Sequence, residues 1–213
     1  MITDNNPNGR RLKMKRTPIT ALAAMAMLAA SSTIATAHVG VGDRGGFANG
    51  FWHPISGVDH VLAMVMVGLF AAQLGGRALY LVPAAFVLVM AIGGAVGFAG
   101  MLVPFVELGI GLSIVVLGTA VALGFRTAIA VAMALAGFFA FFHGYAHGAE
   151  MPETVNGLAY GAGFVIATAL LHAWGLALGL LMASKAGARG ETLVRAAGAL
   201  VAVAGVSMVT GVI

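Results

Sequence analysis

The chain has 213 residues, of which 61% are hydrophobic and only 8% are charged, and its mean hydropathy is +1.02. This composition excludes a soluble globular domain and indicates an integral membrane protein. The absence of cysteine excludes disulfide bonds and thiolate metal ligands. The formal net charge of +4 does not indicate nucleic-acid binding, because a basic cluster at residues 10–16 accounts for it.

Residues 1–37 have the features of a secretory signal peptide. A basic segment precedes an apolar run, and Ala35-Thr36-Ala37 places small residues at both specificity positions of a cleavage site. Cleavage would leave His38 as the first residue of a mature domain, 38–213. An uncleaved membrane anchor and a translation start at Met14 are alternatives that the sequence leaves open.

Six apolar runs follow, each long enough to cross about 30 Å of hydrocarbon. They lie at residues 53–74, 78–99, 102–123, 127–147, 156–182 and 192–212. We therefore expect an all-α fold, a polytopic membrane bundle of six transmembrane helices behind the cleaved signal peptide. Basic residues fall in alternate loops, at Arg77, Arg126, Lys185, Arg189 and Arg195. The positive-inside bias then places the mature N-terminus on the outer side.

Two polar strings interrupt this apolar sequence: His53-Pro54-Ile55-Ser56-Gly57-Val58-Asp59-His60 and His143-Gly144-Tyr145-Ala146-His147-Gly148-Ala149-Glu150. Ionisable side chains are costly in hydrocarbon, and where they occur they usually line a path for a substrate or an ion. Imidazole and carboxylate are ligands for borderline divalent metals such as nickel, cobalt and zinc. The sequence therefore predicts a membrane carrier of such a metal, with no permanently bound cofactor and no enzymatic activity.

Helix geometry predicts two levels of ligands along this path. His143, His147 and Glu150 share one helical face, with the two histidines about 6 Å apart along the axis. His53 and His60 would lie about 10.5 Å apart on a continuous helix, which is too far for one ion. We therefore expect two stations, an outer one of His53, His147 and Glu150 and an inner one of Asp59, His60, His143 and Glu107. A first helix broken between His53 and His60 would instead join both levels in one site.

Two other histidines, His38 and His172, have two interpretations each. His38, with an amine and an imidazole, would be a capture ligand of the outer station or a frayed terminus. His172 would be an exit ligand on the cytoplasmic side or a histidine bonded to a neighbouring helix. Ser113 is expected to bond to its own helix backbone. The clustered histidines and carboxylates themselves have the alternative role of pairing with one another between helices.

The two strings, with the flanking Ala63-Met64 and Phe142, resemble the signature motifs of the HupE/UreJ family of nickel permeases. The similarity continues through residues 71–77 and 167–172. It implies a six-span secondary permease of the bacterial inner membrane, with a periplasmic N-terminus, that admits Ni²⁺ or Co²⁺. It also implies transfer of the metal to hydrogenase or urease maturation proteins. The family's motif positions correspond to His53, Asp59, His60, His143, His147 and Glu150.

Two other functions fit the same ligand types. Three histidines and a carboxylate could form the zinc site of an intramembrane metal-dependent hydrolase, although the chain lacks a His-Glu-x-x-His string. His60 and His143 could be axial ligands of a haem. The sequence contains no phosphate-binding loop, which predicts passive or gradient-coupled transport.

Overall fold

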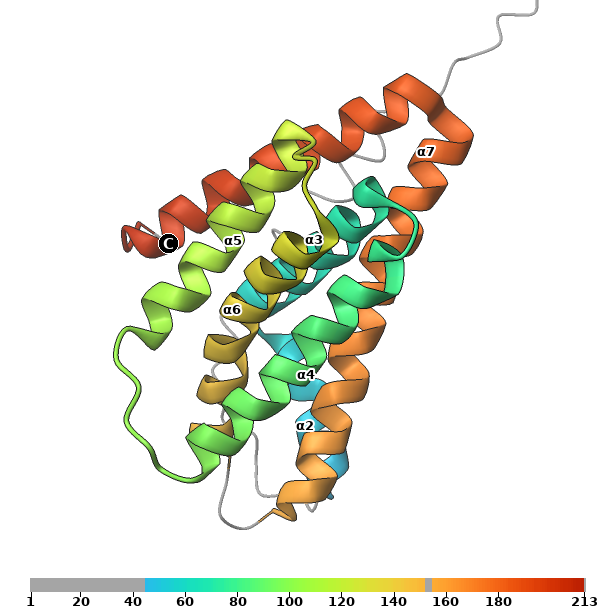
Figure 1. Ribbon diagram of the computed structural model, residues 1–213. Helices are drawn as coiled ribbons and strands as arrows, with labels where there is room; N and C mark the ends of the chain where they lie inside the picture. Colours follow the sequence, from blue (N-terminus) through green and yellow to red (C-terminus); the bar gives the residue numbers. More distant parts are fainter. Residues whose placement is uncertain (1–44, 152–154, 213) are drawn as a thin grey trace, which may run out of the picture. The chain divides into compact units, whose positions relative to one another are not determined.

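The computed structural model describes residues 45–151 and 155–212. The predicted signal peptide and His38 lie outside these residues. All regular secondary structure in the described ranges is helical (Figure 1), which confirms the all-α prediction. The helices are α2 (Gly46–Ser56), α3 (Val58–Leu74), α4 (Ala78–Phe98), α5 (Val106–Leu123), α6 (Ile129–Ala149) and α7 (Gly157–Val209).

Four helices, α4 to α7, are long and apolar enough to cross a membrane, and the bent pair of α2 and α3 would make a fifth span. Helix α7 has 53 residues and is interrupted at Gly187, whose φ of 50° and ψ of −130° are not helical. The helical residues before and after this break coincide with the fifth and sixth predicted runs. The protein is therefore a multi-pass membrane protein, and the count of six spans stays a prediction.

The prediction of one continuous first span, 53–74, is wrong. The chain turns by 80° between α2 and α3, and Gly57 joins them in an extended conformation. Pro54 has no backbone N–H to donate within the last turns of α2. The Oγ of Ser56 lies within hydrogen-bond distance of two carbonyl oxygens of the preceding turn, at 2.7 and 3.0 Å, and its single hydrogen is available to either one. Since these carbonyls are the acceptors that a continuing helix would use, Ser56 helps to end α2.

The helices pack closely at small residues. This is expected in a membrane, where the hydrophobic effect does not drive helices together and association depends on close contact between their backbones. Helices α4 and α6 lie side by side (Figure 1), and a Cβ added to Gly144 of α6 would collide with the backbone carbonyl of Met90 in α4. A Cβ at Gly175 of α7 would likewise collide with the carbonyl of Val65 in α3. The glycines thus allow the backbones of these helix pairs to approach closely.

The basic residues and the polar strings lie at opposite ends of the helices. Helices α3 and α5 run in the same direction, because Gln73 near the end of α3 donates to the carbonyl of Val121 near the end of α5, at 3.0 Å. Arg195 of α7 lies at this end too, where its Nε donates to the carbonyl of Ala122 at 2.9 Å. Asp59 and Glu107, in the first turns of α3 and α5, line one cavity at the other end.

Candidate metal site

Four histidines from three helices form one continuous cluster. Helix α2 supplies His53, α3 supplies His60, and α6 supplies His143 and His147. The ring centre of His147 lies 4.6 Å from that of His53 and 4.2 Å from that of His60. The ring centre of His60 lies 4.7 Å from that of His143. The rings therefore form a series that leads from the partly exposed His53 to the fully buried His143.

This cluster contradicts the geometric premise of two separate ligand levels. The predicted rise of about 10.5 Å between His53 and His60 requires a straight helix, and the 80° bend at Gly57 removes it. His147 contacts both rings, so it belongs to the outer and the inner group at once. The four histidines predicted for two stations therefore form one continuous series.

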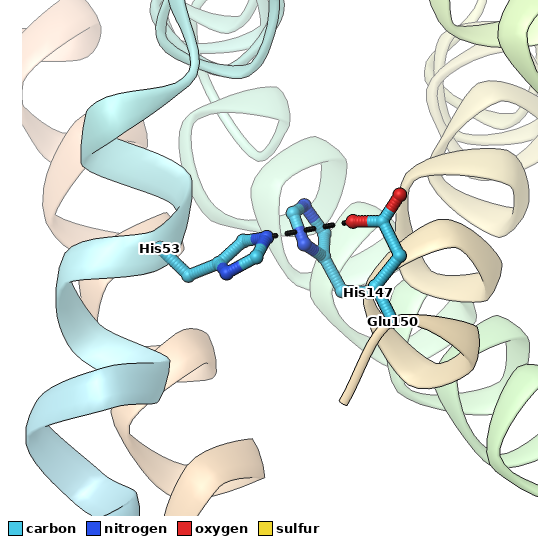
Figure 2. A group of neighbouring side chains, drawn as sticks. All are labelled: His53, His147 and Glu150. Carbon is cyan, nitrogen blue, oxygen red and sulfur yellow. Dashed lines mark ion pairs between the residues drawn. The ribbon is translucent and has the colours of Figure 1, made fainter. Parts of the chain in front are cut away.

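The outer end of the cluster has the geometry of a metal site. One ligand atom each from His53, His147 and Glu150 lies within 4.8 Å of the other two. Figure 2 shows the three side chains pointing toward one another, from α2 on one side and α6 on the other. The Nε2 of His53 lies 3.7 Å from Oε2 of Glu150. Small side-chain movements would place each of the three ligand atoms about 2.1 Å from a divalent ion bound between them.

Asp59 is placed as a hydrogen-bond partner of His60. Its Oδ1 lies 2.9 Å from Nδ1 of His60. An ionised carboxylate only accepts hydrogen bonds, so Nδ1 of His60 carries the hydrogen. The remaining nitrogen, Nε2, is buried and has no partner in the described part of the chain. This carboxylate–imidazole pair is the arrangement that orients metal-ligating histidines and raises their basicity.

Buried ring nitrogens without hydrogen bonds are concentrated in this region. Six of them have no partner among the described residues: Nε2 of His60, Nδ1 of His143, and both nitrogens of His147 and of His172. Leaving a buried donor or acceptor unsatisfied costs about 1–3 kcal/mol, and native proteins contain few such atoms. A divalent metal uses the lone pairs of neutral imidazoles. The donor set therefore fits a metal ion.

Residues 25–208 match the model of the HupE / UreJ protein family. The chain belongs to this family. It is 45% identical over 192 residues to Protein HupE of Rhizobium leguminosarum bv. viciae, an alignment that covers 90% of this chain and 96% of the relative. These matches confirm the family predicted from the two motifs. No solved structure matches the chain.

Glu107 of this HupE/UreJ protein does not join the histidine cluster directly. Its side chain is exposed and lines a cavity of about 290 Å³ together with Asp59. Residues of the first turn of α3, the start of α5 and the last turn of α7 line this open cavity. Asp59 thus both bonds to His60 of the cluster and lines the cavity that Glu107 also lines.

His172 lies in α7 and is 2% exposed. The ring of Phe86 in α4 contacts it, with ring centres 4.9 Å apart, and lies 5.9 Å from the ring of His143. The interpretation that His172 bonds to a neighbouring helix is not supported, because neither ring nitrogen has a hydrogen-bond partner within the described ranges. The fully buried Phe86 thus packs near both His172 and His143 of the cluster.

Ser113 contributes to the site in a way that the sequence analysis does not predict. Its hydroxyl bonds to the carbonyl of Ile110 in the same helix at 2.6 Å, as expected for a helix serine. The same oxygen also lies 2.8 Å from Nε2 of His143 in α6. A hydroxyl in the middle of an apolar span is the sequence signal for such an interhelical contact, since few partners exist there.

Proposed function

We propose that this protein is a secondary transporter that imports a divalent transition metal, nickel or cobalt, across the inner membrane of a bacterium. The observation that carries the proposal is the series of four adjacent histidines, flanked by Asp59 and Glu150, in an apolar helix bundle. Imidazole and carboxylate bind such metals without the thiolates that hold zinc tightly. The metal is the substrate of the protein, and membership in the HupE/UreJ family supports this assignment.

The proposed path follows the burial of the ligands. Glu150 and His53 are the accessible members, with side chains 60% and 37% exposed, and they capture the ion. His147, His60 and His143 are buried and accept it in turn. Neighbouring rings in the series are 4.2 to 4.7 Å apart, so the ion can exchange one ligand at a time and is never without coordination in a medium of low polarity.

The remaining candidates have separate roles in this path. Asp59 and Glu107 place two carboxylates on one cavity beside the cluster, and this negative charge attracts cations. His172 is the exit ligand, reached by the ion after it passes the ring of Phe86. Its two unpartnered buried nitrogens in the described structure support that role.

The orientation follows from the charges at the two ends of the helices. The polar strings lie at one end, and Arg77, Arg126 and Arg195 lie at the other, which the positive-inside bias assigns to the cytoplasm. The histidine cluster then faces the periplasm, as does the mature N-terminus. The ion is released to the cytoplasm, where hydrogenase or urease maturation proteins are its expected recipients.

The alternative functions have less support. The ring centres of His60 and His143 are 4.7 Å apart, so the rings are in contact and leave no room for a porphyrin between two axial ligands. Family membership does not favour an intramembrane hydrolase.

The decisive experiment is uptake of radioactive nickel into liposomes that contain the purified protein alone. We expect saturable uptake without ATP and a large loss in His147→Phe, which keeps a ring in place but removes both nitrogens. Phe138→Ala, an exposed position on the same helix, should transport normally. Uptake no faster than in protein-free liposomes, or a strict need for ATP, would contradict the proposal. Competition by cobalt and zinc in the same assay identifies the preferred metal.

A further inference from the structure

Ser113 joins two helices at the deepest member of the histidine cluster. Both Ser113 in α5 and His143 in α6 are fully buried. The Oγ of Ser113 lies 2.6 Å from the carbonyl oxygen of Ile110 and 2.8 Å from Nε2 of His143. The hydroxyl therefore takes part in two short hydrogen bonds at once, and the direction of each bond can be worked out.

The direction follows from counting hydrogens. A serine hydroxyl has one hydrogen to donate, and a carbonyl oxygen only accepts. The hydrogen of Ser113 is therefore donated to Ile110, and its Oγ accepts the second bond. Nε2 of His143 must carry the hydrogen of that bond. In a neutral imidazole the other nitrogen, Nδ1, then has no hydrogen and offers a lone pair.

We propose that Ser113 is a positioning residue that holds His143 in the Nε2–H tautomer, so that Nδ1 is the atom that binds the transported metal. This inference rests on the proposed function and specifies the ligand atom. Nδ1 of His143 is buried without a hydrogen-bond partner in the described chain, and its ring lies beside that of His60. Metal-ligating histidines almost always donate their other N–H to a fixed acceptor in this way.

The hydrogen-bond acceptor beside each of the two histidines, His60 and His143, suits the polarity of its surroundings. At His60 the acceptor is the carboxylate of Asp59, which is partly exposed and lines a cavity. At His143, where no side-chain surface is accessible, the acceptor is an uncharged hydroxyl. A carboxylate at that depth would place a charge in apolar surroundings, which is costly. Serine supplies the acceptor without the charge.

The first test measures the tautomer directly in the wild-type protein. The protein is labelled with ¹⁵N-histidine, placed in lipid nanodiscs and studied by NMR above the histidine titration range. Ring-nitrogen chemical shifts separate protonated from unprotonated nitrogens, and the signals absent from His143→Phe identify His143. We expect a protonated Nε2 and an unprotonated Nδ1. Added Zn²⁺, a diamagnetic probe, should shift Nδ1 of His143. An Nδ1–H tautomer, or zinc binding through Nε2, would overturn the inference.

The second test measures affinity for Ni²⁺ by titration calorimetry. Ser113→Ala removes the acceptor, so the tautomers of His143 should mix and the affinity should fall about 10–100-fold, as is typical when an outer hydrogen-bond partner of a metal ligand is lost. Ser113→Thr retains a hydroxyl and should restore both the tautomer and the affinity. Ser184→Ala is the matched control, because Ser184 also bonds to the carbonyl three residues earlier, at 3.2 Å, on an exposed part of α7.

The outcomes separate this inference from the proposed function. Wild-type affinity in Ser113→Ala would refute the role of Ser113 while the protein remains a metal carrier. No binding of Ni²⁺ or Zn²⁺ by the wild type would refute the proposed function, and with it the assignment of Nδ1 as a metal ligand. If Ser113→Ala does not fold, the tautomer and zinc shifts of the wild type decide the question without any substitution.

Discussion

The substitution Gly57→Ala tests whether the bond between Asp59 and His60 orients the metal ligand. Gly57 precedes α3 in an extended conformation, with φ of −91° and ψ of 117°, which alanine adopts freely. A Cβ at this position would lie 2.8 Å from Oδ1 of Asp59 and 3.0 Å from Nδ1 of His60, whereas ordinary contact begins at 3.4 Å. The methyl group would therefore press on both atoms of the 2.9 Å hydrogen bond.

We expect Gly57→Ala to fold and to bind nickel about 10–100-fold more weakly, the usual effect of losing an outer partner of a ligating histidine. Folding should survive because the two atoms belong to side chains, which can move apart. Gly45→Ala is the matched control: Gly45 precedes α2, also with extended ψ of 151°, and a Cβ there meets nothing within 4 Å. Both variants lose a glycine at a helix N-cap, so the small stability cost of that change is shared.

Nickel affinity is measured by titration calorimetry, and thermal unfolding in detergent checks that the two variants are equally stable. The prediction is refuted if Gly57→Ala binds nickel as tightly as Gly45→Ala. In that case the Asp59–His60 bond would not determine how His60 presents Nε2.

Three further predictions follow from the site and its surroundings. His147→Phe should weaken nickel binding more than His53→Phe, because the ring of His147 has cluster histidines on both sides; equal dissociation constants would argue against a central position. Uptake should rise as the pH is raised from 5 to 8, since protons compete with the metal for the imidazole lone pairs; a maximum at pH 5 would indicate proton coupling or other ligands. Gly144→Ala should destabilise the protein by about 1–3 kcal/mol or prevent folding, because the added methyl group collides with the carbonyl of Met90. Gly161→Ala is the control and should not destabilise it, because a Cβ there meets nothing within 4 Å. Equal unfolding temperatures of the two variants would contradict the close packing of α4 and α6.

Helices bounded by clear local signals could be predicted from the sequence. The apolar run 78–99 corresponds to α4, Ala78–Phe98, because Gly75 and Gly76 precede it and adopt positive φ values of 71° and 54°. Such values end α3 and are easily reached only by glycine. Hydropathy and turn residues point to the same boundary here.

The break in the first predicted span could not be predicted from hydropathy, which averages over about 20 residues and is insensitive to one torsion angle. The separation of the last two spans was predicted, because a charged stretch divides the apolar runs 156–182 and 192–212. Pro54 and Gly57 are breaker residues, but the apolar run on both sides of them favours a single span. In α7 the charged stretch 185–195 predicts a loop, and the structure has in its place a kink at Gly187 with helical residues on both sides. Lysine, arginine, glutamate and alanine are good helix formers, which explains why the residues next to the kink are helical.

Which residues belong to the site was easier to predict than which of them contact one another. The spacing of His143 and His147 places them on one helical face whatever the tertiary structure. The contacts of His147 with His53 and His60 depend on the bend between α2 and α3 and therefore needed the structure. The bond from His143 to Ser113 depends on how α5 packs against α6 and has no counterpart in local sequence.

The break at Gly57 lets His53 and His60 contact the same side chain, which a straight helix would not allow. With the turn of 80°, α2 and α3 bring His53 and His60 to the same imidazole from two directions. The break also makes the turn that carries His53 the C-terminal end of a helix, where partial negative charge favours cations. Discontinuous helices whose ends face the substrate recur in secondary transporters for this reason. A single interruption of the chain thus brings imidazoles from two helices to His147, and under the proposed function these imidazoles would converge on one metal ion.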